Sequence, residues 1–513
     1  MIPAAASGRR GIPNTVFARV RRRRLRYHWH PSWPKLTMSL RLLGTMAVIL
    51  GLAACSTPRY APEGAEDVLP VPSAWPDSPA AGAPAEAVCR DLGGESLAAL
   101  ESRLAADSLE LRGAVARLRQ AEALARGARS PLLPRLDLAI EGSRGNAVGA
   151  GFLAAQIPGD ALPPGFPAGG VSEQYQGSLA ASYEVDVWGR VRNEYRAAAL
   201  QAEAAGESLA ALEVSLGAQL ADTWASLLAQ RELVALLEEQ LATSEKFLEL
   251  TRLRFGLGQS GAADVGRQRQ QLQRLDGQLG VARGQHRVLE HQLAALLGTP
   301  PDTGPLPDDQ GLPAVPPLPD PGVPAALPEA RPDVRAARLA LAASDRRLAA
   351  AIAQRLPSLS LSGSLISVET MLEDLFTDTL WQAGAEVTTN LFDFGQRRAN
   401  IDLRDAEAEE ALTGYAGALL DAWTEVAVSL AQAHARDDLV TSLRRQLAEA
   451  ERVLTLTRTA YQEGQVDFLD VLLALQSKQN LEQSLIGARR DQYSGRIQLC
   501  RALGVSLLRE EAA

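Results

Sequence analysis

The chain carries one sequence pattern twice, 206 residues apart, and this duplication constrains its fold more than any other feature. The string LTRLRFGLGQ at 250–259 returns, diverged but without gaps, as LTRTAYQEGQ at 456–465. The pairs Gln292-Leu293 and Leu297-Gly298 recur at the same offset. A unit of about 200 residues is far longer than solenoid repeats of roughly 20 to 50 residues. The sequence therefore predicts two pseudo-equivalent halves around an axis.

Each half is expected to contain one very long helix. Proline is absent between Pro167 and Pro300 and after Pro357, and apolar residues in 194–255 and 398–462 recur at helical spacing. A helix over 194–255 would be about 90 Å long at ~1.5 Å per residue. A glycine-containing turn and a second amphipathic helix follow each run.

The residues before each long helix alternate between apolar and polar, which predicts β-strands. These strands are expected within hairpins at about 135–188 and 358–394. Strands of about ten residues have the length of tilted transmembrane strands. The alternative is a sheet packed on a globular core, which does not explain the long helix that follows. Four strands cannot close a barrel, so several copies must close it together; the strands do not set their number.

The N-terminal 54 residues have the features of an export signal. Residues 42–54 are apolar or small, a stretch too short to span a membrane. They end in Leu-Ala-Ala-Cys55, which resembles the lipobox of bacterial lipoproteins and implies N-palmitoyl and S-diacylglycerol groups on Cys55. The alternative is an ordinary signal peptide with a chance cysteine. The residue after the cysteine is Ser56, which resembles the signal for sorting to the outer membrane in such lipoproteins. Met38 is hypothesised to be the true first residue of the signal peptide.

Two proline-rich stretches divide the remaining chain. Residues 55–88 are expected to be a lipid-anchored tether that supplies no core, and 300–332 a linker between the repeats. The repeats themselves are assigned to 89–299 and 333–507, with a tail at 508–513.

Cys89 and Cys500 lie near the two ends of the body, and export permits them to pair. The alternative is two buried free thiols.

Charge and composition exclude several classes of function. Residues 1–54 hold ten Lys and Arg and no acid, so their removal changes the formal charge from -9 to -19. Such an acidic body argues against nucleic-acid binding. His286, His291 and His434 are scattered, no phosphate-binding loop is present, and Met371 is the only methionine after Cys55. We therefore expect no enzyme, no cofactor, no metal site and no methionine-rich metal relay.

Three strings of the sequence resemble those of TolC-like outer-membrane factors of the lipoprotein (NodT-type) branch. They are YEVDVWGRVR at 183–192, RPDVR at 331–335 and NLFDFGQR at 390–397. The resemblance covers nearly all of 89–507. It implies a mainly α-helical homotrimer with a transmembrane β part, in which twelve strands form a β-barrel in the outer membrane. Twelve helices would form a continuous α-barrel across the periplasm.

The resemblance also implies that the two helix-hairpin turns contact a periplasmic adaptor protein. The residues assigned to these tips are Gly256, Gly258, Gln259, Ser260, Asp264, Gly464, Gln465 and Asp470. Glycine suits a turn with positive φ, and each aspartate can cap the following helix. A tight turn alone would also explain the Gly and Asp positions.

Some relatives close the tip with charged side chains, but this chain has apolar residues in the second turn. We expect a pore constriction formed by Val466, Leu472 and Leu473, with Glu463 and Asp467 nearby. The alternative is that Leu472 and Leu473 only pack the hairpin.

The expected function is a passive duct that exports small amphiphilic compounds from the periplasm. A resistance-nodulation-division pump in the inner membrane would drive it through the adaptor. The alternatives are the outer-membrane duct of a type I protein secretion system and a coiled-coil scaffold without a pore. The sequence names neither the compounds nor the pump.

Overall fold

A computed structural model of the chain describes residues 67–76, 83–90, 92, 94–146, 171–301 and 311–507. The expected signal peptide, Cys55 and the tail 508–513 lie outside these residues. Among the described helices, none is long and apolar enough to cross a membrane.

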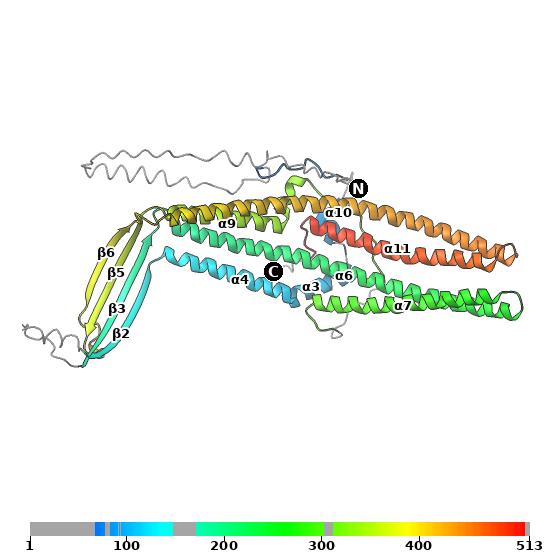
Figure 1. Ribbon diagram of the computed structural model, residues 1–513, viewed down its shortest axis with the longest axis horizontal. Coiled ribbons are helices and arrows are strands. Elements are labelled where there is room, and N and C mark those ends of the chain that lie inside the picture. The colour runs from blue at the N-terminus through cyan, green and yellow to red at the C-terminus, as the bar shows by residue number, and fades with distance from the viewer. Residues whose placement is uncertain are drawn as a thin grey trace, which may run out of the picture. The chain divides into compact units, whose positions relative to one another are not determined.

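Two helices of 67 residues dominate the body, α6 (Arg190–Gly256) and α10 (Gln396–Gln462). Each is about 100 Å long at ~1.5 Å per residue. A 35-residue helix follows each one, α7 (Ala262–Leu296) and α11 (Phe468–Ala502). All four boundaries keep the 206-residue offset of the sequence repeat. Figure 1 shows the hairpins α6–α7 and α10–α11 ending in turns at the end of the body opposite the sheet.

The shorter elements connect the long helices to the sheet and to one another. They are β1 (Ala83–Pro84), α2 (Ala85–Arg90), α3 (Gly94–Asp107), α4 (Leu109–Arg129), η3 (Ser130–Leu132), β4 (Pro319–Asp320), η4 (Pro324–Ala326), α8 (Leu327–Ala330), α9 (Pro332–Ala353) and η5 (Leu372–Asp374).

One antiparallel sheet joins the two repeats. Its strands β2 (Arg135–Asn146), β3 (Val171–Val185), β5 (Ser358–Glu369) and β6 (Leu380–Thr388) lie in the order β2-β3-β5-β6. The central pair crosses the repeats, with Leu179 opposite Leu365. In the described part of the chain, β2 and β6 are open edges. The sheet is therefore open at both sides, and the backbone hydrogen-bonding groups at its edges require another strand or solvent.

Strands β3 and β6 end at Val185 and Thr388, and an aspartate follows each strand before the long helix begins. Asp186 accepts hydrogen bonds from the backbone N–H groups of Val191 (3.1 Å) and Arg192 (2.9 Å). Asp393 accepts hydrogen bonds from the backbone N–H groups of Gly395 (3.1 Å) and Arg397 (3.3 Å). These bonds stabilise the turn into each long helix, because the first N–H groups of a helix lack partners within it.

The main core lies where α3, α6 and α11 meet. Leu220 and Tyr493 are fully buried there, and the rings of Trp224 and Tyr493 are 6.3 Å apart. A disulfide joins Cys89 to Cys500 within the same cluster. It connects the start of the first repeat to the end of the second.

The two repeats close in the same way at their C-terminal ends. Gly298 and Gly504 adopt φ of 68° and 76°, which favours glycine. A Cβ at Gly298 would lie 2.6 Å from the carbonyl oxygen of Asp107, and one at Gly504 would lie 2.9 Å from that of Ala330. Both glycines therefore permit close packing, of the end of α7 on the end of α3 and of the end of α11 on the end of α8.

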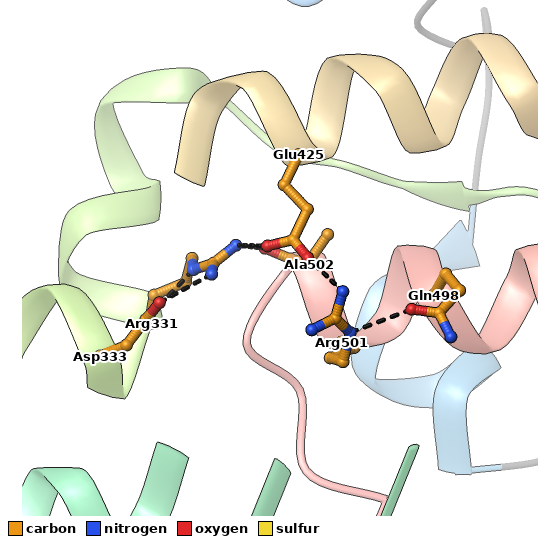
Figure 2. A network of polar contacts seen from close by, with 6 residues as sticks. All are labelled: Arg331, Asp333, Glu425, Gln498, Arg501 and Ala502. Carbon is orange, nitrogen blue, oxygen red and sulfur yellow. Dashed lines mark hydrogen bonds and ion pairs between the residues drawn. The ribbon is translucent and has the colours of Figure 1, made fainter. Parts of the chain in front are cut away.

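A buried arginine joins three helices at the junction of the repeats (Figure 2). The Arg331 side chain, 11% exposed, donates to both carboxylate oxygens of Asp333 at 3.0 and 2.7 Å. It also donates to Glu425 of α10 at 2.7 Å and to the carbonyl of Ala502 at 2.9 Å. Arg501 contacts the other oxygen of Glu425. This network joins the ends of α9 and α11 to the middle of α10.

The expectation that 55–88 supplies no core is wrong. Trp75 is 6% exposed and belongs to the cluster around Leu327 and Trp423. Ala83 pairs with Pro319 of the inter-repeat segment in a short parallel bridge. A single large aromatic side chain buries substantial apolar area even where prolines prevent a helix, which explains this packing.

Candidate functional site: the two helix-hairpin turns

The first turn ends α6 with a left-handed glycine. The Gly258 N–H donates to the carbonyl of Phe255 (3.0 Å), and the Gln259 N–H donates to that of Arg254 (2.8 Å). Gly258 has a φ of 74°. This arrangement satisfies carbonyls at the helix end and is the usual reason for glycine at such a position.

The second turn repeats this geometry. The Gly464 N–H donates to Tyr461 (3.1 Å), and the Gln465 N–H donates to Ala460 (2.8 Å). Gly464 has a φ of 75°. Gly256, by contrast, is the last residue of α6 without positive φ, so its backbone does not require glycine.

Asp264 stabilises the start of α7. One carboxylate oxygen accepts from the Gly261 N–H (3.0 Å) and the Ser260 hydroxyl (3.1 Å), and the other accepts from Arg267. Burial raises the pKa of the Asp264 carboxyl, but these donors outweigh burial and hold the pKa below its ordinary value. The carboxylate therefore stays charged near the positive end of the helix.

Asp470 has the equivalent position in the second turn. Its carboxylate accepts from the Asp467 N–H at 3.2 Å. The exposed Gln465 side chain donates to Glu463 at 2.7 Å. Gln259 and Gln465 both lie on the surface, where a partner could reach them.

An arginine–tyrosine contact joins the two hairpins near their turns. The Arg254 guanidinium lies 4.7 Å from the centre of the Tyr461 ring and donates to its hydroxyl. The Tyr461 ring also packs against Phe468 at 5.8 Å. This contact was not predicted from the sequence. Its only signal was that Arg254 and Tyr461 belong to the duplicated strings while Ala460 replaces the arginine in the second copy.

Further from the turns, side-chain amides join α6, α7 and α11 in a cluster that was also not predicted from the sequence. Gln271 donates to Gln479 (3.1 Å) and accepts from Gln476 (2.9 Å). Gln240 donates to Glu482 (3.0 Å) and accepts from the Gln483 side chain (2.8 Å). Gln240 and Gln271 are 4% and 3% exposed, so these hydrogen bonds replace solvent.

The three residues expected to constrict a pore differ in exposure. Leu473 is 54% exposed and shares a face of α11 with Leu469, which is 38% exposed. Leu472 is only 3% exposed, so it has no free surface in the single chain to line a pore. Val466 is half-buried. A constriction therefore depends on Leu473.

In the described residues, no group of three or more His, Cys, Asp or Glu side chains could hold a metal ion. The site consists of two similar turns, a polar connection between hairpins and an exposed apolar face. Such a surface suits contact with a partner.

The chain belongs to the outer membrane efflux protein family, whose family model matches residues 100–299 and 323–505. It is 29% identical over 472 residues to the pyoverdine export outer membrane protein OpmQ of Pseudomonas aeruginosa, covering 91% of this chain and 97% of the relative. It is 30% identical over 387 residues to the toluene efflux pump outer membrane protein TtgF of Pseudomonas putida, covering 74% and 77%.

The solved structure of the outer-membrane channel OprN has the same fold. It superposes with a TM-score of 0.77 at 25% identity, covering 88% of this chain and all of that one. The predicted resemblance to TolC-like outer-membrane factors is confirmed. The chain is thus an outer-membrane channel of efflux pumps, in a family of channels and not of enzymes.

Proposed function

We propose that the chain is the outer-membrane duct of a tripartite efflux system. Three copies surround one pore, and the sheets of the three copies close into a twelve-stranded barrel. An inner-membrane pump of the resistance-nodulation-division class drives export, and a periplasmic adaptor joins the pump to the turns. The cargo is small amphiphilic compounds.

The observation that carries this proposal is the pair of matching turns at the ends of the two long hairpins. Their backbone hydrogen bonds agree at two pairs of positions 206 residues apart, Gly258 with Gly464 and Gln259 with Gln465. Three copies would present six such turns around one mouth, the periplasmic opening of the pore. A repeated partner such as an adaptor could bind each of them in a similar way.

The open sheet edges support the trimer. β2 and β6 lack partner strands in the described residues, and unpaired backbone groups are costly in lipid. The alternating face of β2 supports a lipid contact, because Leu136, Leu138 and Ile140 are each more than half exposed. Three copies would pair every β6 with a neighbouring β2.

A photo-crosslinking residue at Gln465 tests the adaptor contact. We expect it to capture the adaptor in cells, while the same residue at Gln285, exposed on α7 about 36 Å from the turn at ~1.5 Å per residue, captures none.

Deletion of the gene is expected to increase accumulation of an amphiphilic dye. Unchanged dye accumulation with loss of one secreted polypeptide would instead establish the protein-secretion alternative.

A further inference from the structure

A surface groove of about 440 Å³ runs between α10 and α11, the orange and red hairpin in Figure 1. Its walls come from one face of each helix. The lining residues are Arg445, Gln446, Glu449, Ala450, Val453, Ala474, Ser477 and Leu481. Gln446 and Ser477 are exposed in it.

The equivalent surface of the first repeat is covered. Subtracting 206 from the lining positions gives, among others, five residues that are at most 4% exposed. They are Gln240, Ser244, Gln268, Gln271 and Leu275. The first repeat therefore buries, on α6 and α7, the surface that the second repeat leaves open.

Within one chain, α11 covers that surface. Gln479 and Gln476 bond Gln271 at 3.1 and 2.9 Å. Glu482 and Gln483 bond Gln240 at 3.0 and 2.8 Å. These four α11 residues form an internal template for whatever fills the second groove.

The repeat assigns the equivalent residues to α7. Positions 476, 479, 482 and 483 correspond to Gln270, Gln273, Asp276 and Gly277. All four are exposed. One chain thus has an open groove and, on a different helix, an open face that matches what the groove should receive. A groove and its ligand on the same chain predict contact between copies.

We propose that helix α7 of a second copy fills the α10–α11 groove in the register of the internal template. Ser477 then contacts Gln270 and Gln273 of that copy, and Gln446 contacts its Asp276. This inference rests on the proposed trimeric duct and adds to it the residues of the contact between subunits.

Sequence differences between the repeats make this contact less polar than the internal one. Ala450 and Ala474 replace Ser244 and Gln268, whose side chains bond each other at 2.9 Å. Gly277 replaces Gln483 and cannot donate to Gln446. Ser244 and Gln268 bond each other within the α6–α7 hairpin, so only the loss of the Gln483 donor removes a side-chain hydrogen bond from the contact itself. The contact between copies is therefore expected to separate more readily than the internal one.

Cysteine cross-linking in the full-length protein in membranes tests the register. The pairs Ser477→Cys with Gln273→Cys and Gln446→Cys with Asp276→Cys are expected to give, on oxidation, a band at twice the mass of the mature chain. The control pairs Ser477→Cys with Arg287→Cys. Arg287 is exposed on α7 but lies fourteen residues, about 21 Å, further along. This pair is expected to give no such band.

The outcomes separate the register from the function. Absence of the band for both test pairs in a protein that still forms trimers and exports would overturn the register alone. An equal band from the Arg287 control would also overturn it, because the contact would then be unspecific. A protein that is monomeric in membranes would overturn the proposed duct together with this inference.

Discussion

Arg254 of the first hairpin stacks on Tyr461 of the second, with 4.7 Å between the guanidinium carbon and the ring centre. The same arginine donates to the tyrosine hydroxyl. In the repeat, Tyr461 is equivalent to Phe255, which is 49% exposed. The contact therefore distinguishes the two otherwise similar turns and joins them within one chain.

Removing the Tyr461 ring should loosen the two hairpins near their turns. A cation–π contact contributes about 0.5 to 2 kcal/mol, and a hydrogen bond adds to it. We expect Tyr461→Ala to raise single-channel conductance in planar bilayers. Tyr461→Phe keeps the ring and should have a smaller effect. Equal conductance of wild type and Tyr461→Ala would show that the contact does not restrain the mouth.

The Arg331 network should be important for stability. Arg331→Met leaves the carboxylate of Glu425 without this charged partner in a largely buried place. Breaking a buried pair from one side typically costs about 3 to 5 kcal/mol when the remaining charge has no other partner, and the loss here should be smaller because Arg501 still contacts Glu425. Thermal unfolding should therefore occur at a clearly lower temperature.

Arg338→Met is the matched control for this variant. Its ion pair with Glu329 is exposed, with side chains 38% and 64% accessible. Such pairs contribute about 0 to 1 kcal/mol, so the unfolding temperature should hardly change. Similar losses for both variants would contradict a special role of the Arg331 network.

The same network predicts a loss of stability in acid. Burial raises the pKa of Asp333, but the hydrogen bonds and charge of Arg331 outweigh burial and hold the pKa below its ordinary value. A lowered folded pKa gives stability that is present above the unfolded pKa of about 3.9 and lost as pH falls through the folded value.

Thermal unfolding of wild type and Asp333→Asn, followed from pH 6 downward, checks this sign. The variant lacks the carboxylate, so wild type should be the more stable protein at pH 6. The difference should shrink below about pH 4. A difference that grows in acid would reject the assignment.

The disulfide between Cys89 and Cys500 should stabilise the body by closing most of the chain into a loop. The two residues are 411 positions apart, and removing native disulfides typically costs about 2 to 5 kcal/mol. We expect no reactive thiol in the denatured, unreduced mature protein and two after reduction. Two thiols before reduction would mean that the cysteines stay unpaired in the cell.

Sequence alone could predict the long helices, because absence of proline and regular apolar spacing are local properties. It could not predict side-chain contacts between repeats. Gln240 and Gln446 occupy equivalent positions in the repeat, yet the first is 4% exposed and the second is exposed. Their difference depends on which helix lies opposite, and that helix is more than 200 residues away. Trp75 shows the same limit, since its burial depends on distant helices.

An exposed apolar face near the mouth leads to the last prediction. Leu473 is 54% exposed in the single chain, and three copies would place three such side chains around the pore. An apolar ring can block ions by excluding water. Leu473→Ser should therefore raise conductance and the uptake of an antibiotic that the outer membrane normally excludes. Leu420→Ser is the control, because Leu420 is similarly exposed, at 57%, in the middle of α10 and far from the turn. If Leu473→Ser and Leu420→Ser both behaved as wild type, Leu473 would not form the constriction.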